Sequence, residues 1–76
     1  MQVTAILTPS EIGGYVAFNP ETGTTTQGKT VEEALENLRE AVELYLEEVP
    51  MTFAGPALVT TVTLREHALA AGTFGA

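Results

Sequence analysis

The chain has 76 residues, of which ten are acidic and three basic, so its formal net charge is −7. A chain this short buries only about 60% of the surface it exposes when unfolded, so we expect self-association to add to its stability. The absence of cysteine and of any apolar run near the ~20 residues of a membrane span favours a cytoplasmic protein, and three basic residues are too few for direct nucleic-acid binding.

Residues 2–28 have the pattern of a three-stranded antiparallel meander. Alternating and β-branched residues predict strands over 2–8, 15–18 and 24–27. The residues between these strands are typical of turns, at Pro9, Ser10, Gly13, Gly14, Asn19, Pro20 and Gly23. We expect alternate residues of the first strand, from Val3 through Ala5 to Leu7, to share one face.

An amphipathic helix is predicted from Thr30 onward. Thr30 and Glu33 have the spacing of a capping box, in which the hydroxyl accepts from the amide of Glu33 and the carboxylate accepts from the amide of Thr30. Apolar residues then recur at intervals of three and four, at Val31, Ala34, Leu35, Leu38, Ala41, Val42 and Tyr45. Pro50 should end the helix, because a proline disfavours the helical conformation of the residue before it, here Val49.

A loop over 51–56 precedes a fourth predicted strand at 58–64. One face of that strand would carry Leu58, Thr60, Val62 and Leu64, and the other Val59, Thr61 and Thr63. We expect the domain core to span 2–64 and residues 65–76 to form a short turn or a frayed tail. The chain is thus predicted to be a single α+β domain of β-β-β-α-β order, with one long helix packed across one face of a small, mostly antiparallel sheet.

The reactive side chains argue against an enzyme. The only serine, Ser10, lies in a predicted turn, the only histidine is His67, and no aspartate is present to orient a catalytic base. We interpret His67 as a solvated histidine rather than a ligand or a pH-responsive group. The glycines match neither a phosphate-binding loop nor a dinucleotide fingerprint. We therefore expect no catalytic residue and no cofactor.

Metal binding is also not predicted. Five glutamates share a surface of the predicted helix, namely Glu32, Glu36, Glu40, Glu43 and Glu47. Carboxylates four residues apart could bind a hard cation, but an exposed helix face lacks the enclosing ligands that tight binding needs. The first predicted strand carries no carboxylate, although strands often supply the rigid ligands of metal-dependent nucleases. We interpret the face as solvated.

Most of the negative charge lies on the predicted helix. Residues 30–48 contain seven glutamates and one arginine, a net charge of −6. Pairs such as Glu36 with Glu40 and Glu43 with Glu47 each destabilise an isolated helix by roughly 0.2–0.5 kcal/mol. Two interpretations stay open: the surface attracts a basic partner, or acidic helices are tolerated because they are soluble.

The order of motifs over 15–48 resembles the HicB-like antitoxin domain, and with the preceding strand the resemblance covers roughly residues 2–48. The resemblance rests on 14–17, 19–23, 26–30 and 31–41, and its most specific part is the block T-Q-G-x-T-x-E-E-A at 26–34. It implies a reduced ribonuclease H-like fold and an antitoxin whose partner is a small, basic, RNA-cleaving, HicA-like toxin. Lys29 departs from the family, which usually has an acidic residue there. The chain also stops where many relatives continue into a DNA-binding domain, so we expect a stand-alone form.

We therefore expect a non-enzymatic, cytoplasmic module that binds and neutralises a basic toxin. The candidate partner-binding residues are Glu36, Glu40, Glu43 and Glu47, and the open sheet edge is an alternative surface. Exposed edges also favour a homo-oligomer. The alternative function is a stand-alone regulatory or small-ligand-binding module of the same fold without a toxin, and a degenerate metal-dependent nuclease is a more remote alternative. We expect no membrane partner.

Overall fold

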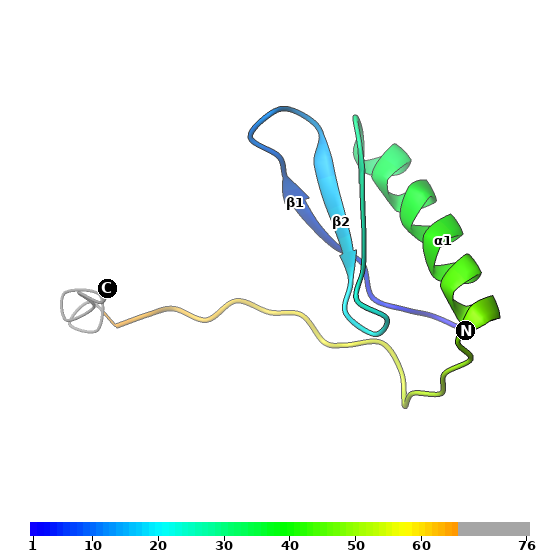
Figure 1. Cartoon of the computed structure of the whole chain (residues 1–76). Coiled ribbons are helices and arrows are strands. Elements are labelled where there is room, and N and C mark those ends of the chain that lie inside the picture. Colours follow the sequence, from blue (N-terminus) through cyan, green and yellow to red (C-terminus); the bar gives the residue numbers. More distant parts are fainter. Residues whose placement is uncertain (66–76) are drawn as a thin grey trace.

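A computed structural model describes residues 1–65. Three strands, β1 (Ile6–Pro9), β2 (Tyr15–Asn19) and β3 (Thr24–Gly28), form an antiparallel sheet of order β1-β2-β3. A single helix, α1 (Val31–Glu48), follows and packs on β2 and β3 (Figure 1). The predicted α+β class, with a meander covered by one long helix, is confirmed. Within residues 1–65, no helix combines the length and the apolar character needed to cross a membrane.

The strand register gives the sheet one covered and one open face. Leu7 pairs with Ala17, and Ala17 with Thr26, which places this row against α1. Ala17 is fully buried there. The next row, Ile6 with Phe18, lies on the opposite face because successive strand residues point to opposite sides. The open face therefore carries part of the chain's apolar side chains.

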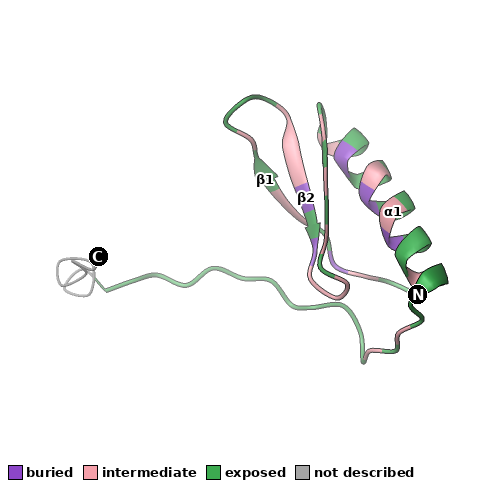
Figure 2. Cartoon of the chain, in the orientation of Figure 1, coloured by how far each residue is buried: buried purple, intermediate pink, exposed green. Residues whose placement is uncertain are grey.

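The core is small and lies between α1 and the sheet. Its buried residues are Ala17 of β2 and Ala34, Leu38 and Val42, which form one stripe along α1. Figure 2 shows the buried bands along α1 and on β2. Partly buried side chains complete the cluster, at Val3, Leu7, Tyr15 and Leu46. So few buried side chains agree with the limited core expected of a short chain.

Gly28 brings β3 close to the start of α1. A Cβ atom at this position would lie 2.5 Å from the backbone nitrogen of Ala34, which no side chain tolerates. Two side-chain hydrogen bonds then join β3 to the helix: the Thr26 hydroxyl donates to the Ala34 carbonyl (3.1 Å), and Asn37 Nδ2 donates to the Gln27 carbonyl (2.8 Å). The strand and the first half of α1 are thus one packed unit.

Both predicted ends of the helix are confirmed, with one changed contact. The Glu33 amide donates to the Thr30 hydroxyl at 3.1 Å, as the capping box requires. The Glu33 carboxylate, however, accepts from the amide of Lys29 (2.5 Å) and not from that of Thr30. At the other end Val49 leaves the helical region, with a φ of −131°, and its amide donates to the Tyr45 carbonyl at 2.8 Å.

Two strand predictions are wrong. The first strand begins at Ile6 rather than at residue 2, because the amide and hydroxyl of Thr4 donate to Glu21 instead of joining the sheet. Ala5 is accordingly exposed and does not share a buried face with Val3. The predicted strand at 58–64 does not form, because no other strand of the described chain lies beside it to accept its hydrogen bonds.

Residues 50–57 instead lead back to the sheet, where the Ala57 amide donates to Glu21, and residues 58–65 then extend away from the domain (Figure 1). The predicted turn or frayed tail falls almost wholly outside the described residues, as does His67. Ser10 lies, as predicted, in the turn between β1 and β2, where its hydroxyl accepts from the amide of Ile12 at 3.3 Å.

Candidate protein-binding surface

Four exposed carboxylates form a stripe on the outer side of α1. They are Glu36, Glu40, Glu43 and Glu47, here called the acidic stripe. Their spacing of four, three and four residues keeps them on one side of a helix with 3.6 residues per turn. The same geometry places the buried stripe, centred on Leu38, on the opposite side. The helix therefore turns its apolar side to the sheet and holds the carboxylates in solvent.

The charge of the acidic stripe is poorly compensated. Arg39 Nη1 lies 3.8 Å from Glu36 Oε1, and the two side chains are 69% and 55% exposed. An exposed pair of this kind contributes only about 0–1 kcal/mol. Within residues 1–65, Glu40, Glu43 and Glu47 form no ion pair. The last turn of α1 contains no basic residue either, although the helix dipole favours one there.

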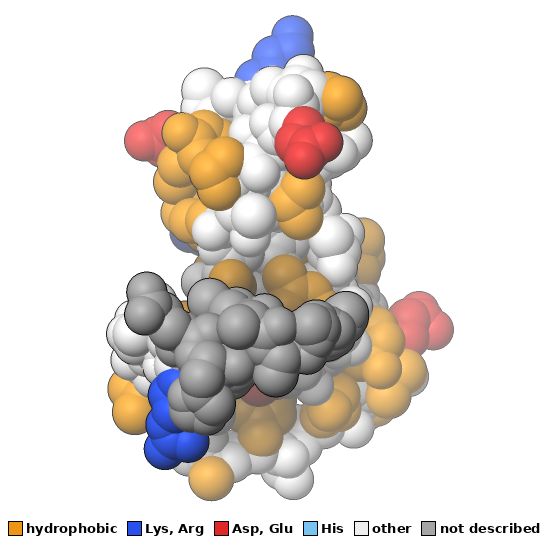
Figure 3. All heavy atoms as spheres, turned by 90° about the vertical axis from the view of Figure 1, so that its left-hand side faces the viewer, with side chains coloured by type: hydrophobic (Ala, Val, Ile, Leu, Met, Phe, Trp, Pro, Cys, Tyr) orange, Lys and Arg blue, Asp and Glu red, His pale blue; other side chains and the backbone are white. Residues whose placement is uncertain are grey.

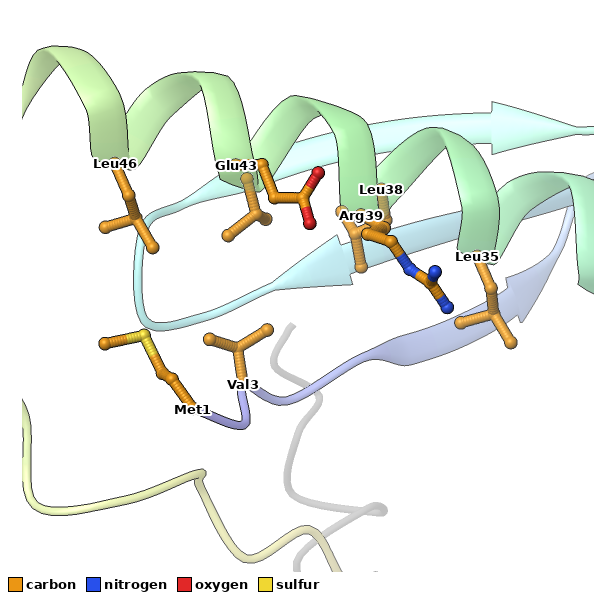
Figure 4. Close-up of a pocket in the computed structure, with 8 residues that line it drawn as sticks. Met1, Val3, Leu35, Leu38, Arg39, Glu43 and Leu46 are labelled. Atoms are coloured by element: carbon orange, nitrogen blue, oxygen red, sulfur yellow. The ribbon is translucent and has the colours of Figure 1, made fainter.

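An apolar groove lies beside the acidic stripe, between α1 and the N-terminal stretch that leads into β1. Its volume is about 580 Å³. Leu35, Leu38 and Leu46 point from the helix toward Met1 and Val3 (Figure 4). The remaining lining residues are Arg39, Val42 and Glu43. The groove exists because α1 packs over β2 and β3 and leaves β1 largely uncovered, so helical spacing alone could not reveal it.

A partly buried polar cluster holds the end of the sheet where β2 turns into β3. Glu21 Oε1 accepts from the Thr4 amide (2.8 Å) and from Asn19 Nδ2 (2.7 Å). Glu21 Oε2 accepts from the Thr4 hydroxyl (2.7 Å) and from the Ala57 amide (2.8 Å). These hydrogen bonds, that from the Thr4 backbone foremost, outweigh desolvation and lower the pKa of the Glu21 carboxyl to about 2.

Asn19 completes this cluster from a fully buried position. Its Nδ2 also donates to the Thr4 carbonyl at 2.8 Å, while its Oδ1 accepts from the amide and hydroxyl of Thr22 at 2.9 and 2.6 Å. Every buried side-chain polar atom of the described chain has a hydrogen-bond partner. The sequence predicts a turn at Asn19 and no structural role for Glu21. The motif N-P-E-T-G at 19–23 is the one signal that points to these residues.

The cluster has a positioning role. It joins the stretch that precedes β1, the turn after β2 and the segment after α1, and Thr4 and Ala57 are 53 positions apart. Both carboxylate oxygens of Glu21 already accept two hydrogen bonds each, which leaves little capacity for a ligand. In residues 1–65 no three His, Cys, Asp or Glu side chains gather where they could hold a metal ion.

These features define a small acidic α+β domain with a β-β-β-α order and an exposed, charged helix. Over 47 residues the chain is 49% identical to a UPF0150 protein of Helicobacter pylori, over 60% of this chain and 64% of that relative. It is 46% identical over 50 residues to a UPF0150 protein of Thermoplasma acidophilum, over 64% of this chain and 72% of the relative. The chain belongs to the UPF0150 family.

A third relative agrees with this assignment. A UPF0150 protein of Synechocystis is 47% identical over 47 residues, which are 60% of this chain and 60% of the relative. The match thus spans less than two thirds of the Helicobacter and Synechocystis proteins. No family model matches the chain. No solved structure matches it at a significant level.

Proposed function

We propose that the chain is a non-enzymatic, HicB-like antitoxin domain that binds and neutralises a small, basic, RNA-cleaving toxin in the cytoplasm. The acidic stripe carries this proposal, because three of its four carboxylates form no ion pair within residues 1–65. Membership of the UPF0150 family is consistent with it. The block at 26–34, which resembles HicB-like domains, supplies the specific link to a toxin.

The fold suits the stripe to such a partner. Because Leu38 and its neighbours anchor one side of α1 to the sheet, the carboxylates opposite are held on a rigid element. From Glu36 to Glu47 the helix rises about 16 Å, so the stripe presents negative charge along an extended line. Arginine and lysine form their strongest hydrogen bonds with ionised oxygens, whether of carboxylates or of phosphates.

Neutralisation then follows from competition for one surface. A toxin that cleaves RNA must hold phosphates with basic side chains. When those side chains bind the acidic stripe, the phosphates of the RNA can no longer reach them. Opposite charges also accelerate the encounter, so association should slow as the salt concentration rises.

The test combines an RNA-cleavage assay with calorimetry, which measures the affinity of the chain for the toxin. A HicA-like toxin from the same genome should lose its activity when one equivalent of the chain is added, and the chain alone with Mg²⁺ should cleave no RNA. Unchanged cleavage by the toxin, with the chain folded, would reject the antitoxin function and favour a regulatory or ligand-binding module. Cleavage by the repurified chain alone would reject the non-enzymatic assignment.

A matched pair of variants tests the acidic stripe itself. Exposed ion pairs contribute about 0.2–1 kcal/mol each, so E40Q/E43Q should weaken toxin binding roughly 2- to 30-fold. E11Q/E48Q removes the same net charge from exposed residues outside the stripe and should weaken binding much less. Equal losses would show that only net charge matters, and a full retention of affinity would move the interface to the sheet edge.

A further inference from the structure

Residues 58–64 form an extended and unpaired segment in the described chain. Leu58, Val62 and Leu64 are 95%, 80% and 63% exposed, which is unusual for aliphatic side chains so close together. Together with Thr60 they occupy alternate positions, and Val59, Thr61 and Thr63 lie between them, as in a strand with one mostly apolar side. The segment therefore has the composition of a strand but lies beside no other strand.

The sheet offers an edge where such a strand fits. β1 pairs only with β2, so its outer edge is free in the described structure. The apolar groove lies between α1 and the stretch that enters this strand (Figure 4). A strand added along β1 would direct every second side chain toward α1, into the groove. Seven extended residues reach about 23 Å, enough to pass the roughly 16 Å of helix between Leu35 and Leu46.

The segment of the same chain does not fill this groove. The Ala57 amide donates to Glu21 Oε2 (2.8 Å) and to the Thr4 hydroxyl (2.5 Å), which ties the start of the segment to the polar cluster. From there the chain runs away from α1 (Figure 1). Reciprocal addition of the same segment between two copies closes as a two-fold dimer.

The distribution of charged side chains favours a second copy of this chain, rather than a basic protein, as the occupant of the groove. Residues 50–64 contain no charged side chain, and neither do β1 and β2. Figure 3 shows this side of the molecule, where hydrophobic side chains are widespread and few charged ones are visible. A basic partner would be drawn to the acidic stripe instead. Two copies, in contrast, repel each other through their helices and can meet at a neutral edge.

We propose that residues 58–64 of one chain add as a strand to the free edge of β1 in a second copy, and place Leu58, Val62 and Leu64 in the groove under α1. The exchange is reciprocal and gives a two-fold dimer. It uses the apolar groove rather than the acidic stripe, and Glu43 is the one residue of the stripe that borders the groove.

Light scattering and isotope-filtered NMR on the full chain test the exchange. The expected mass is about 16 kDa, twice the 8.0 kDa of one chain. In a sample mixed from labelled and unlabelled chains, the methyl groups of Val62 and Leu64 should show intermolecular contacts with Leu38 and Leu46. A monomer at 100 micromolar concentration would overturn the proposal. So would a dimer whose contacts from 58–64 are all intramolecular.

Two neighbouring substitutions test which side of the segment enters the groove. V62D should weaken dimerisation roughly tenfold or more, because it brings a charge into an apolar site. T63D adds the same charge on the opposite side of the strand and should change the dissociation constant by less than about twofold. Both variants should retain the helical circular dichroism of the parent, because neither position lies in the core. Equal effects of V62D and T63D would refute the assigned side.

Discussion

Leu38 is the residue on which the packing of α1 against the sheet should depend most. It is 3% exposed and lies at the centre of the buried stripe, between Ala34 and Val42. Leucine-to-alanine changes in cores cost about 2–5 kcal/mol. Because Leu38 also borders the groove, part of the space it leaves opens into the groove rather than into the closed core. We therefore expect L38A to lower the free energy of unfolding by about 2–3 kcal/mol, the lower part of that range.

Leu44 provides the matched control, since it is a leucine of the same helix and is 63% exposed. L44A should change the free energy of unfolding by less than about 0.5 kcal/mol. Urea unfolding followed by circular dichroism at fixed chain concentration measures both. A chain of this size has a total stability of about 4–11 kcal/mol, so the loss in L38A is easily resolved. Similar losses in the two variants would refute the orientation of α1.

Two further predictions concern Glu21 and Gly28. Because the folded-state pKa of Glu21 is about 2, below its ordinary 4.5, its hydrogen bonds stabilise the fold above pH 4.5 and this contribution is lost as the pH falls toward 2. The Tm of the parent chain should therefore fall over that range, E21Q should show a shallower fall, and E11Q should behave like the parent. In thermal unfolding, G28A should lower the Tm strongly, because its Cβ would lie 2.5 Å from the backbone nitrogen of Ala34. In G23A the new Cβ would meet no atom within 4 Å, and only the strain of a positive φ, about 1 kcal/mol, would destabilise the fold. A similar Tm for G28A and G23A would contradict the close approach of β3 to α1.

Helix limits and strand positions could be predicted where their causes are local. The cap at Thr30 depends on Glu33, three residues away, and the end at Val49 depends on the next residue, Pro50. The acidic stripe could be predicted for the same reason, because the spacing of its glutamates alone places them on one side of a helix. These features need no knowledge of the tertiary fold.

Features that depend on distant residues could not be predicted. Thr4 leaves the first strand because Glu21, 17 positions later, accepts from its amide and hydroxyl. The groove forms because α1 lies over β2 and β3 rather than over β1, and no pattern in the sequence indicates that arrangement. Residues 58–64 have the pattern of a strand, but a strand also needs a neighbour, and the described chain does not supply one.

The two proposed interactions use surfaces of opposite character, and this separation has a physical reason. Copies that met through α1 would bring two helices of net charge −6 together, at a cost that only a basic partner can offset. Exchange of the uncharged residues 58–64 avoids that repulsion and places the new strand in the apolar groove, which only Glu43 of the acidic stripe borders. Each copy in such a dimer keeps its carboxylates in solvent, so self-association and toxin binding can occur together. Because Glu21 ties Ala57 to the domain, acidification that protonates Glu21 should loosen the exit of the exchanged segment.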